Sequence, residues 1–168
     1  MTEKTVDGGS KKFSQSLGIV SNTSLQPHHN DDIMTDCIFC KIAKGEVPCH
    51  KIYEDNEVIV ILDRSQLTLG HSMVIPKNHK RWLWHHEDEE YTKIMHTAKK
   101  IANAMRDSLK IDWVEMVVAG MGVQHTHVHI LPRYDDDGHG EIPIPNTKTK
   151  EFKEEDMKKV VEEIKKSL

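Results

Sequence analysis

The stretch "VAGMGVQHTHVHILPRY", residues 118–134, decides the fold, because it places three histidines among residues that otherwise predict a buried strand. Successive side chains of a strand point to opposite faces, so His125, His127 and His129 share one face and Thr126 lies on the other. Three adjacent imidazoles against a dry core would each need a hydrogen-bond partner. The imidazole face is therefore expected to meet solvent, a ligand or a metal.

Two chemical uses fit such a row of histidines. Neutral imidazoles bind divalent metal ions, and imidazole is also a nucleophile and a general acid or base near neutral pH. Metal-dependent amidohydrolases carry a His-x-His strand near the start of a barrel of about 250 residues, whereas this pattern lies late in a shorter chain. A cupin-type jelly roll suits the length better, but it has no place for the long helix that residues 87–110 predict.

Outward from the histidines, the chain predicts strands and helices in a segregated order. Apolar residues at helical spacing over 87–110, with acids in the first turn, predict one long amphipathic helix. A short helix is expected after "CIFC", stopped by Gly45, and residues 153–168 predict a C-terminal helix. Strands are expected at residues 49–55, 57–63, 71–76, 113–120 and 125–131. This order favours an α+β domain with an antiparallel sheet over a doubly wound parallel sheet.

Length and composition predict one domain and exclude two classes of partner. The 168 residues, 37% of them hydrophobic, suffice for one core. The net charge of −4 comes from 27 acidic and 23 basic residues in mixed order, which argues against nucleic-acid binding. No apolar run reaches the roughly 20 residues that span a membrane, and a cytoplasmic location is expected.

The composition and periodicity of the sequence change near Met34. Residues 1–33 are polar and lack helix or strand periodicity, so we expect a mobile leader, either disordered or added before an original start at Met34. The domain is expected to cover residues 34–168, with residues 135–168 as a C-terminal extension. Within it, Cys37 and Cys40 form a Cys-x-x-Cys pair that, in a reducing compartment, indicates a metal or redox site.

The motif "HTHVHIL", residues 125–131, resembles the signature of the histidine triad (HIT) superfamily of nucleotide hydrolases and transferases. The resemblance extends to "DCIFCKIAKGEVPCHKIYEDNEVIVILDRSQLTLGHSMVIPKNH" and "HILPRY", and it covers about residues 35–134. It implies a HIT-like two-layer fold, in which a mostly antiparallel five-stranded sheet packs on the long helix. It also implies a homodimer, paired through that helix and an edge strand, and a purine nucleotide as substrate.

The resemblance implies a role for each site residue. His127 attacks the α-phosphorus and forms a covalent nucleotidyl-histidine, which water then cleaves, while His129 donates to a phosphate oxygen. The backbone N–H groups of Gly122 and Val123 lie beside the phosphate. Asp63 corresponds to the acid that binds the ribose hydroxyls. The apolar slot for the base is implied at four positions that plain core packing explains equally well: Ile38, Phe39, Ile42 and Ile61.

The resemblance to zinc-bearing HIT proteins, and to the related galactose-1-phosphate uridylyltransferases, implies that the cysteine pair binds zinc. They complete a zinc tetrahedron with the histidine of "VIPKxH" and the first triad histidine. The implied ligands of a closed, structural zinc are therefore Cys37, Cys40, His79 and His125. The alternative is that the two cysteines are simply buried thiols.

The chain departs from many members in the loop before the triad. Their "AGQSV" offers a polar side chain to phosphate, whereas this chain has "AGMGV". A catalytically weak nucleotide-binding module with a structural zinc is the alternative function, and a zinc protein that binds another protein is a third. His85 and His86 lie in a polar stretch and are expected to be solvated. Arg133 either meets phosphate or has a surface role.

Overall fold

The computed structural model describes residues 36–141 and 149–168, which form a five-stranded sheet with helices on both of its faces. All neighbouring strands are antiparallel, in the order β1-β2-β3-β5-β4. The strands are β1 (Lys51–Glu54), β2 (Val58–Leu62), β3 (Ser72–Pro76), β4 (Trp113–Val117) and β5 (Val128–Arg133). The expected α+β class and antiparallel five-stranded sheet are confirmed.

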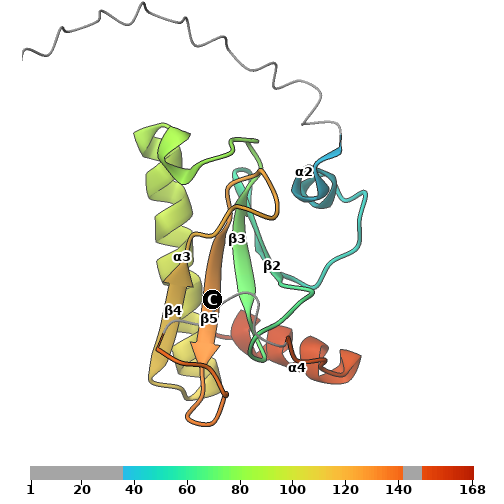
Figure 1. Ribbon diagram of the computed structural model, residues 1–168, viewed down its shortest axis with the longest axis vertical. Coiled ribbons are helices and arrows are strands. Elements are labelled where there is room, and N and C mark those ends of the chain that lie inside the picture. Colours follow the sequence, from blue (N-terminus) through green and yellow to red (C-terminus); the bar gives the residue numbers. More distant parts are fainter. Residues whose placement is uncertain (1–35, 142–148) are drawn as a thin grey trace, which may run out of the picture.

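The two faces of the sheet pack against different helices, which lie on opposite sides of it in Figure 1. Strand β2 is buried on both faces. Val58, Val60 and Leu62 point toward α3 (Asp88–Leu109), whereas Ile59 and Ile61 point toward α2 (Ile38–Ala43). The triad histidines lie on the α2 side, because Val128 and Ile130 belong to the cluster under α3.

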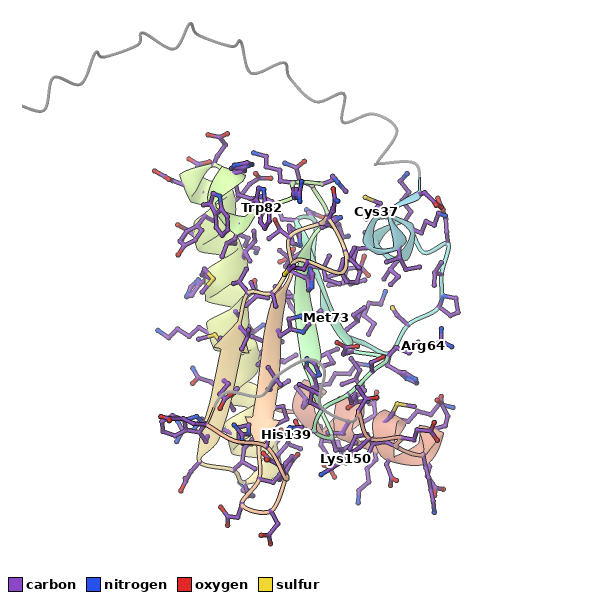
Figure 2. All side chains as sticks on the ribbon, in the orientation of Figure 1. Cys37, Arg64, Met73, Trp82, His139 and Lys150 are labelled. Atoms are coloured by element: carbon purple, nitrogen blue, oxygen red, sulfur yellow. The ribbon has the colours of Figure 1, made fainter. Side chains whose placement is uncertain are left out.

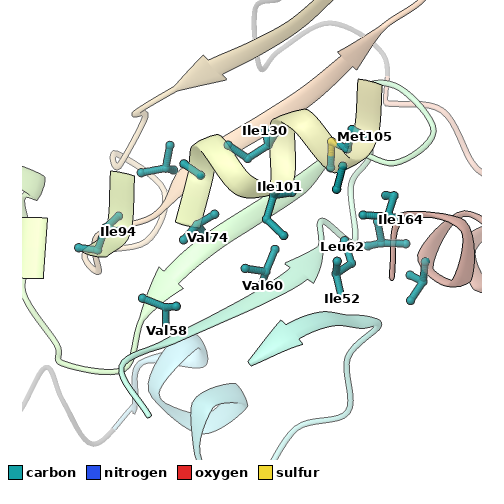
Figure 3. Close-up of a cluster of buried hydrophobic side chains, with 14 of the residues drawn as sticks. Ile52, Val58, Val60, Leu62, Val74, Ile94, Ile101, Met105, Ile130 and Ile164 are labelled. Carbon is teal, nitrogen blue, oxygen red and sulfur yellow. The ribbon is translucent and has the colours of Figure 1, made fainter. Parts of the chain in front are cut away.

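Helix α4 (Glu154–Lys165) completes the larger core together with α3. Its buried residues Val160, Val161 and Ile164 join the cluster that Figure 3 shows around Val60 and Ile101. The amphipathic helices expected at residues 87–110 and 153–168 are therefore confirmed. None of the helices in the described parts of the chain is long and apolar enough to cross a membrane.

Strand β5 begins three residues later than expected, at Val128. The register between β3 and β5 pairs Val74 with Val128, and its continuation would place Thr126 opposite Pro76. Proline has no N–H to donate to a ladder. The N–H of Thr126 bonds instead to the carbonyl of Lys80, at 2.7 Å. His125 and His127 therefore lie in an extended segment just before the strand, still on the α2 side.

The predictions for the two ends of the chain are tested only in part. The leader expected at residues 1–33 lies outside the described residues, as does the middle of the C-terminal extension, residues 142–148. The domain boundary at residue 34 stays a prediction.

Candidate active site and metal centre

Four side chains from three segments meet beside the N-terminus of α2. Cys37 and Cys40 flank the first turn of that helix, His79 follows β3, and His125 precedes β5. One ligating atom of each lies within 4.8 Å of the others. Nδ1 of His125 is 3.4 Å from Sγ of Cys37 and 3.6 Å from Sγ of Cys40, and Nδ1 of His79 is 3.2 Å from Sγ of Cys40.

These distances fit the edges of a zinc tetrahedron. With Zn–S bonds of about 2.3 Å and Zn–N bonds of about 2.0 Å, each S···N edge is about 3.5 Å. The Nε2–H of His125 donates to the carbonyl of Pro76 at 2.8 Å, which leaves the Nδ1 lone pair directed at the thiols. This is the tautomer that a metal ligand needs, held by the kind of outer hydrogen bond that orients metal-binding histidines. The donor set therefore suits zinc.

The backbone carbonyl of His125 fixes the tautomer of His127. Its Nδ1–H donates to the carbonyl of His125 at 2.7 Å, so the lone pair of a neutral ring lies on Nε2. Burial of the ring lowers its pKa, which favours this neutral form. The ring of Phe39 packs edge-on against it, with ring centroids 4.9 Å apart. His127 thus has its free nitrogen fixed in a buried setting.

The tautomer of His129 is fixed by His71, a residue for which the sequence predicts no role. The backbone N–H of Leu67 donates to Nδ1 of His71 at 3.3 Å, so the ring proton of His71 lies on Nε2. That proton is donated to Nδ1 of His129, 2.9 Å away. His129 consequently carries its own proton on Nε2. Burial lowers the pKa of both rings to about 4, so both are neutral at pH 7.

Asp63 ends β2 beside this histidine pair. Its Oδ1 accepts the N–H of Ser65 at 2.8 Å, and Oδ2 lies 3.7 Å from His71 and 3.8 Å from His129. The three residues form a second cluster of metal-ligand type. Nε2 of His71 carries the proton, however, so it cannot offer a lone pair to an ion while Leu67 donates to Nδ1. The arrangement favours hydrogen bonding by Asp63 and His129 over metal binding.

Comparison with known proteins agrees with this geometry. The HIT domain model matches residues 44–136, more than half of the chain. The chain belongs to the HIT family. It is 39% identical over 138 residues to the protein hit of Bacillus subtilis, a match that covers 79% of this chain and 94% of that relative. The expected family is therefore confirmed.

Two further matches are to proteins whose descriptions state an enzymatic activity or a bound metal. The chain is 37% identical over 101 residues to an adenosine 5′-monophosphoramidase of Saccharomyces cerevisiae, covering 60% of this chain and 64% of the enzyme. A crystal structure described as a Zn-bound histidine triad family protein from Mycobacterium smegmatis superposes with a TM-score of 0.65 at 26% identity. That match covers 80% of this chain and 94% of the other. The proteins similar to this chain thus include an adenosine 5′-monophosphoramidase, by sequence, and a zinc-bound protein, by structure.

The four residues expected to form the base slot divide into two groups. Phe39, Ile42 and Ile61 are buried in the cluster between α2 and the sheet, where plain packing accounts for them. Ile38 is 40% exposed, and its side chain is the member of the group that a ligand could reach. Val123 packs against the same cluster, whereas Gly122 is exposed. Met121, beside it, is 97% exposed, so the tip of the "AGMGV" loop at Met121 and Gly122 faces solvent.

Two expectations about polar residues are settled by their contacts. His85 is exposed as expected, but His86 is buried, so its predicted solvation is wrong. Its ring lies within hydrogen-bond distance of Thr126, which is distant in sequence, and of Glu90, which is four residues away. The polar residues next to His86 in the sequence do not indicate that its ring is buried. The guanidinium of Arg133 binds the carboxylates of Glu115 and Asp137, which leaves it a structural role.

Arg133 with the carboxylates of Glu115 and Asp137, here called the Arg133 clamp, can be located through neighbours of Asp137 that Figure 2 labels. Cys37 and Trp82 mark one end of the molecule, and His139 and Lys150 mark the opposite end. His139 and Lys150 both belong to the region around Asp137: the N–H of His139 donates to Oδ1 of Asp137, and Nζ of Lys150 donates to its carbonyl. The Arg133 clamp therefore fastens the C-terminal segment and does not face the triad.

Proposed function

We propose that this HIT protein is a hydrolase that cleaves a nucleoside 5′-phosphoryl compound, most simply an adenylyl compound, through a covalent intermediate on His127. The observation that carries the proposal is the 2.7 Å bond from Nδ1–H of His127 to the carbonyl of His125, which leaves Nε2 free to attack. In the first step the Nε2–P bond forms while the bond from phosphorus to the leaving group breaks. Water then breaks the Nε2–P bond and releases the nucleoside monophosphate.

The surrounding side chains support this reaction. The Nε2–H that His71 leaves on His129 can donate to a phosphate oxygen on the same face of the sheet. The carboxylate of Asp63, with Oδ2 turned toward the histidines, suits the ribose hydroxyls. The proposal assigns the purine base to Ile38, which is exposed beside the buried ring of Phe39, and the phosphate to the backbone of Gly122 and Val123.

We propose a structural zinc at Cys37, Cys40, His79 and His125. When bound, it ties α2 to the loop after β3 and to the segment before β5. All four positions of the tetrahedron come from the protein, which leaves no place for a reactive water. The free thiols of Cys37, Cys40 and Cys49 suit the reducing conditions of a cytoplasmic location.

Trapping tests the enzymatic reaction. The zinc-loaded protein is incubated with adenosine 5′-phosphoramidate or a dinucleoside polyphosphate, quenched, and digested for mass spectrometry. We expect an adenylylated peptide that contains His127 and release of adenosine monophosphate, with neither in a His127→Ala variant. Turnover by the wild type no faster than by His127→Ala would contradict the proposal for these substrates.

A nucleotide-binding module with little turnover is the second candidate, favoured by the exposed "AGMGV" loop. Met121 and Gly122 offer no polar side chain to a phosphate, so leaving-group departure lacks a donor from that loop. Calorimetric titration with adenosine monophosphate separates the two functions. Binding that His127→Ala retains, combined with turnover at the level of that variant, would favour the binding module.

A further inference from the structure

The peptide unit between His125 and Thr126 is held at both of its ends. Its carbonyl accepts the Nδ1–H of His127 at 2.7 Å, and its N–H donates to the carbonyl of Lys80 at 2.7 Å. Hydrogen bonds in such a chain polarise one another. The carbonyl of Lys80 thus acts through one peptide group on the ring of His127.

The side chain of Thr126 fastens the same unit a second time. Its hydroxyl donates to the carbonyl of Lys80 at 2.8 Å, so both lone pairs of that oxygen are used. Because its hydrogen is directed there, the hydroxyl oxygen of Thr126 accepts from Nε2–H of His86, 3.0 Å away. Both Thr126 and His86 are buried, on the opposite side of the chain from the nucleophile's face.

The first turn of α3 anchors this arrangement. Oε2 of Glu90 lies 3.2 Å from Nδ1 of His86 and 3.3 Å from Nζ of Lys80, and Oε1 accepts from Asn78 at 2.6 Å. Through Asn78 and Lys80, Glu90 ties the loop after β3 to the helix, and its carboxylate lies beside the ring of His86. The side chains of this network, from Asn78 to Thr126, are separate from the four metal-ligand side chains.

The intervening segment is stiffened by stacking. The rings of Trp82 and Trp84 are parallel within 9°, with centroids 5.1 Å apart, and the guanidinium of Arg81 lies 4.7 Å from the centroid of Trp82. A single 3₁₀ turn, η1 (Leu83–His85), leads from this stack to His86. The loop between His79 and α3 thus carries an aromatic stack directly before His86.

We propose that Thr126, held by the carbonyl of Lys80 and by the ring of His86, is a positioning residue for His127. The inference rests on the proposed function for its kinetic consequence, but its structural content is independent of turnover. The network fixes the peptide plane whose carbonyl sets the tautomer of His127. None of its side chains needs to touch the substrate.

Thr126→Val is the direct test, because valine keeps the shape and removes the hydroxyl. We expect kcat to fall about tenfold with KM within about twofold of wild type, since small misplacements of a reacting group carry costs of this size. Two-bond proton–nitrogen spectra of the imidazoles should show a smaller share of the Nδ1–H tautomer at His127, whose signals His127→Ala identifies. Thr126→Ser restores the hydroxyl and should restore both readouts.

Two further variants keep the test decisive. Thr97→Val removes the hydroxyl of another buried threonine, on α3 outside the network, and should leave kcat and the His127 spectra unchanged. Glu90→Ala removes the contacts of Glu90 with Asn78 and Lys80 at a partly exposed position and should shift both readouts in the same direction as Thr126→Val. It keeps the inference testable if Thr126→Val does not fold. Wild-type nitrogen spectra and kcat in folded Thr126→Val or Glu90→Ala would overturn the inference. Absence of turnover in the wild type would contradict the proposed function alone, because the spectra still test the network.

Discussion

A single backbone N–H fixes the tautomers of two histidines, His71 and His129. Leu67 donates to Nδ1 of His71, and this one bond places the proton of His71 on Nε2 and that of His129 on its outer nitrogen. His71→Phe keeps a ring of similar size but removes the donor to His129. We expect kcat to fall about tenfold, the equivalent of one net hydrogen bond. Steady-state kinetics check this against His85→Phe, a change at an exposed histidine that should leave kcat unaltered.

The same two rings make the free energy of unfolding depend on pH. Burial lowers the pKa of His71 and His129 from 6.5 to about 4, so the folded state disfavours their charged forms. Below about pH 6.5 the unfolded chain takes up protons that the folded chain does not. This stability is therefore complete above pH 6.5 and is lost as the pH falls toward 4, with an upper bound of about 3 kcal/mol for each ring.

Urea unfolding at pH 7, 6 and 5 measures this effect, with His71→Phe as the comparison. The variant should lose less stability between pH 7 and pH 5 than the wild type, because one titrating ring is gone. Protonation of the metal-ligand histidines contributes to both proteins and cancels in the difference. Equal pH dependence in the two proteins would show that His71 is not the buried, neutral ring described.

At the scale of elements, α2 joins the metal-ligand cluster to the smaller core of the sheet. Cys37 and Cys40 flank its first turn at the metal-ligand cluster, while Phe39 between them is buried against the sheet. Cys40→Ser should lower bound zinc to less than about half an equivalent, since tight closure needs all four ligands. It should also weaken nucleotide binding, because α2 is then no longer attached through zinc to the loop after β3 and to the segment before β5. Elemental analysis and calorimetry measure the two effects, and Cys49→Ser, at an exposed cysteine, should change neither.

The periodicity of the sequence was enough to predict most elements, because strands β2 and β3 and helix α3 bury strongly apolar faces. The start of β5 could not be predicted from periodicity, since the N–H of Thr126 bonds to the carbonyl of Lys80 in a separate loop and does not continue the ladder with β3. The metal-ligand set of Cys37, Cys40, His79 and His125 was identified from the family resemblance, and its members do meet. His71 and His86 were not identified, because their partners are brought together by strand register and by a loop that the local pattern does not encode.

For the whole molecule, α4 makes the C-terminal extension part of the core. Ile164 is fully buried in the cluster under α3 and β2, far along the chain from the elements it touches. Ile164→Ala should lower the free energy of unfolding by about 2 to 5 kcal/mol, the usual range for deleting such a side chain. Chemical denaturation checks this against Leu168→Ala at the exposed chain end, and a loss below about 1 kcal/mol would contradict the packing of α4.

Strand β4 is the edge of the sheet with the most exposed apolar surface among the described residues. Trp113 is 65% exposed and Met116 is 49% exposed, and an open cavity of about 660 Å³ lies along the strand. An unpaired apolar edge invites pairing with another chain, and a second copy pairing edge to edge through β4 would cover it. We therefore predict a homodimer. Met116→Lys should shift the protein toward a monomer in light scattering coupled to size exclusion, whereas Leu168→Lys should not, and a wild type that is monomeric at micromolar concentration would contradict the prediction.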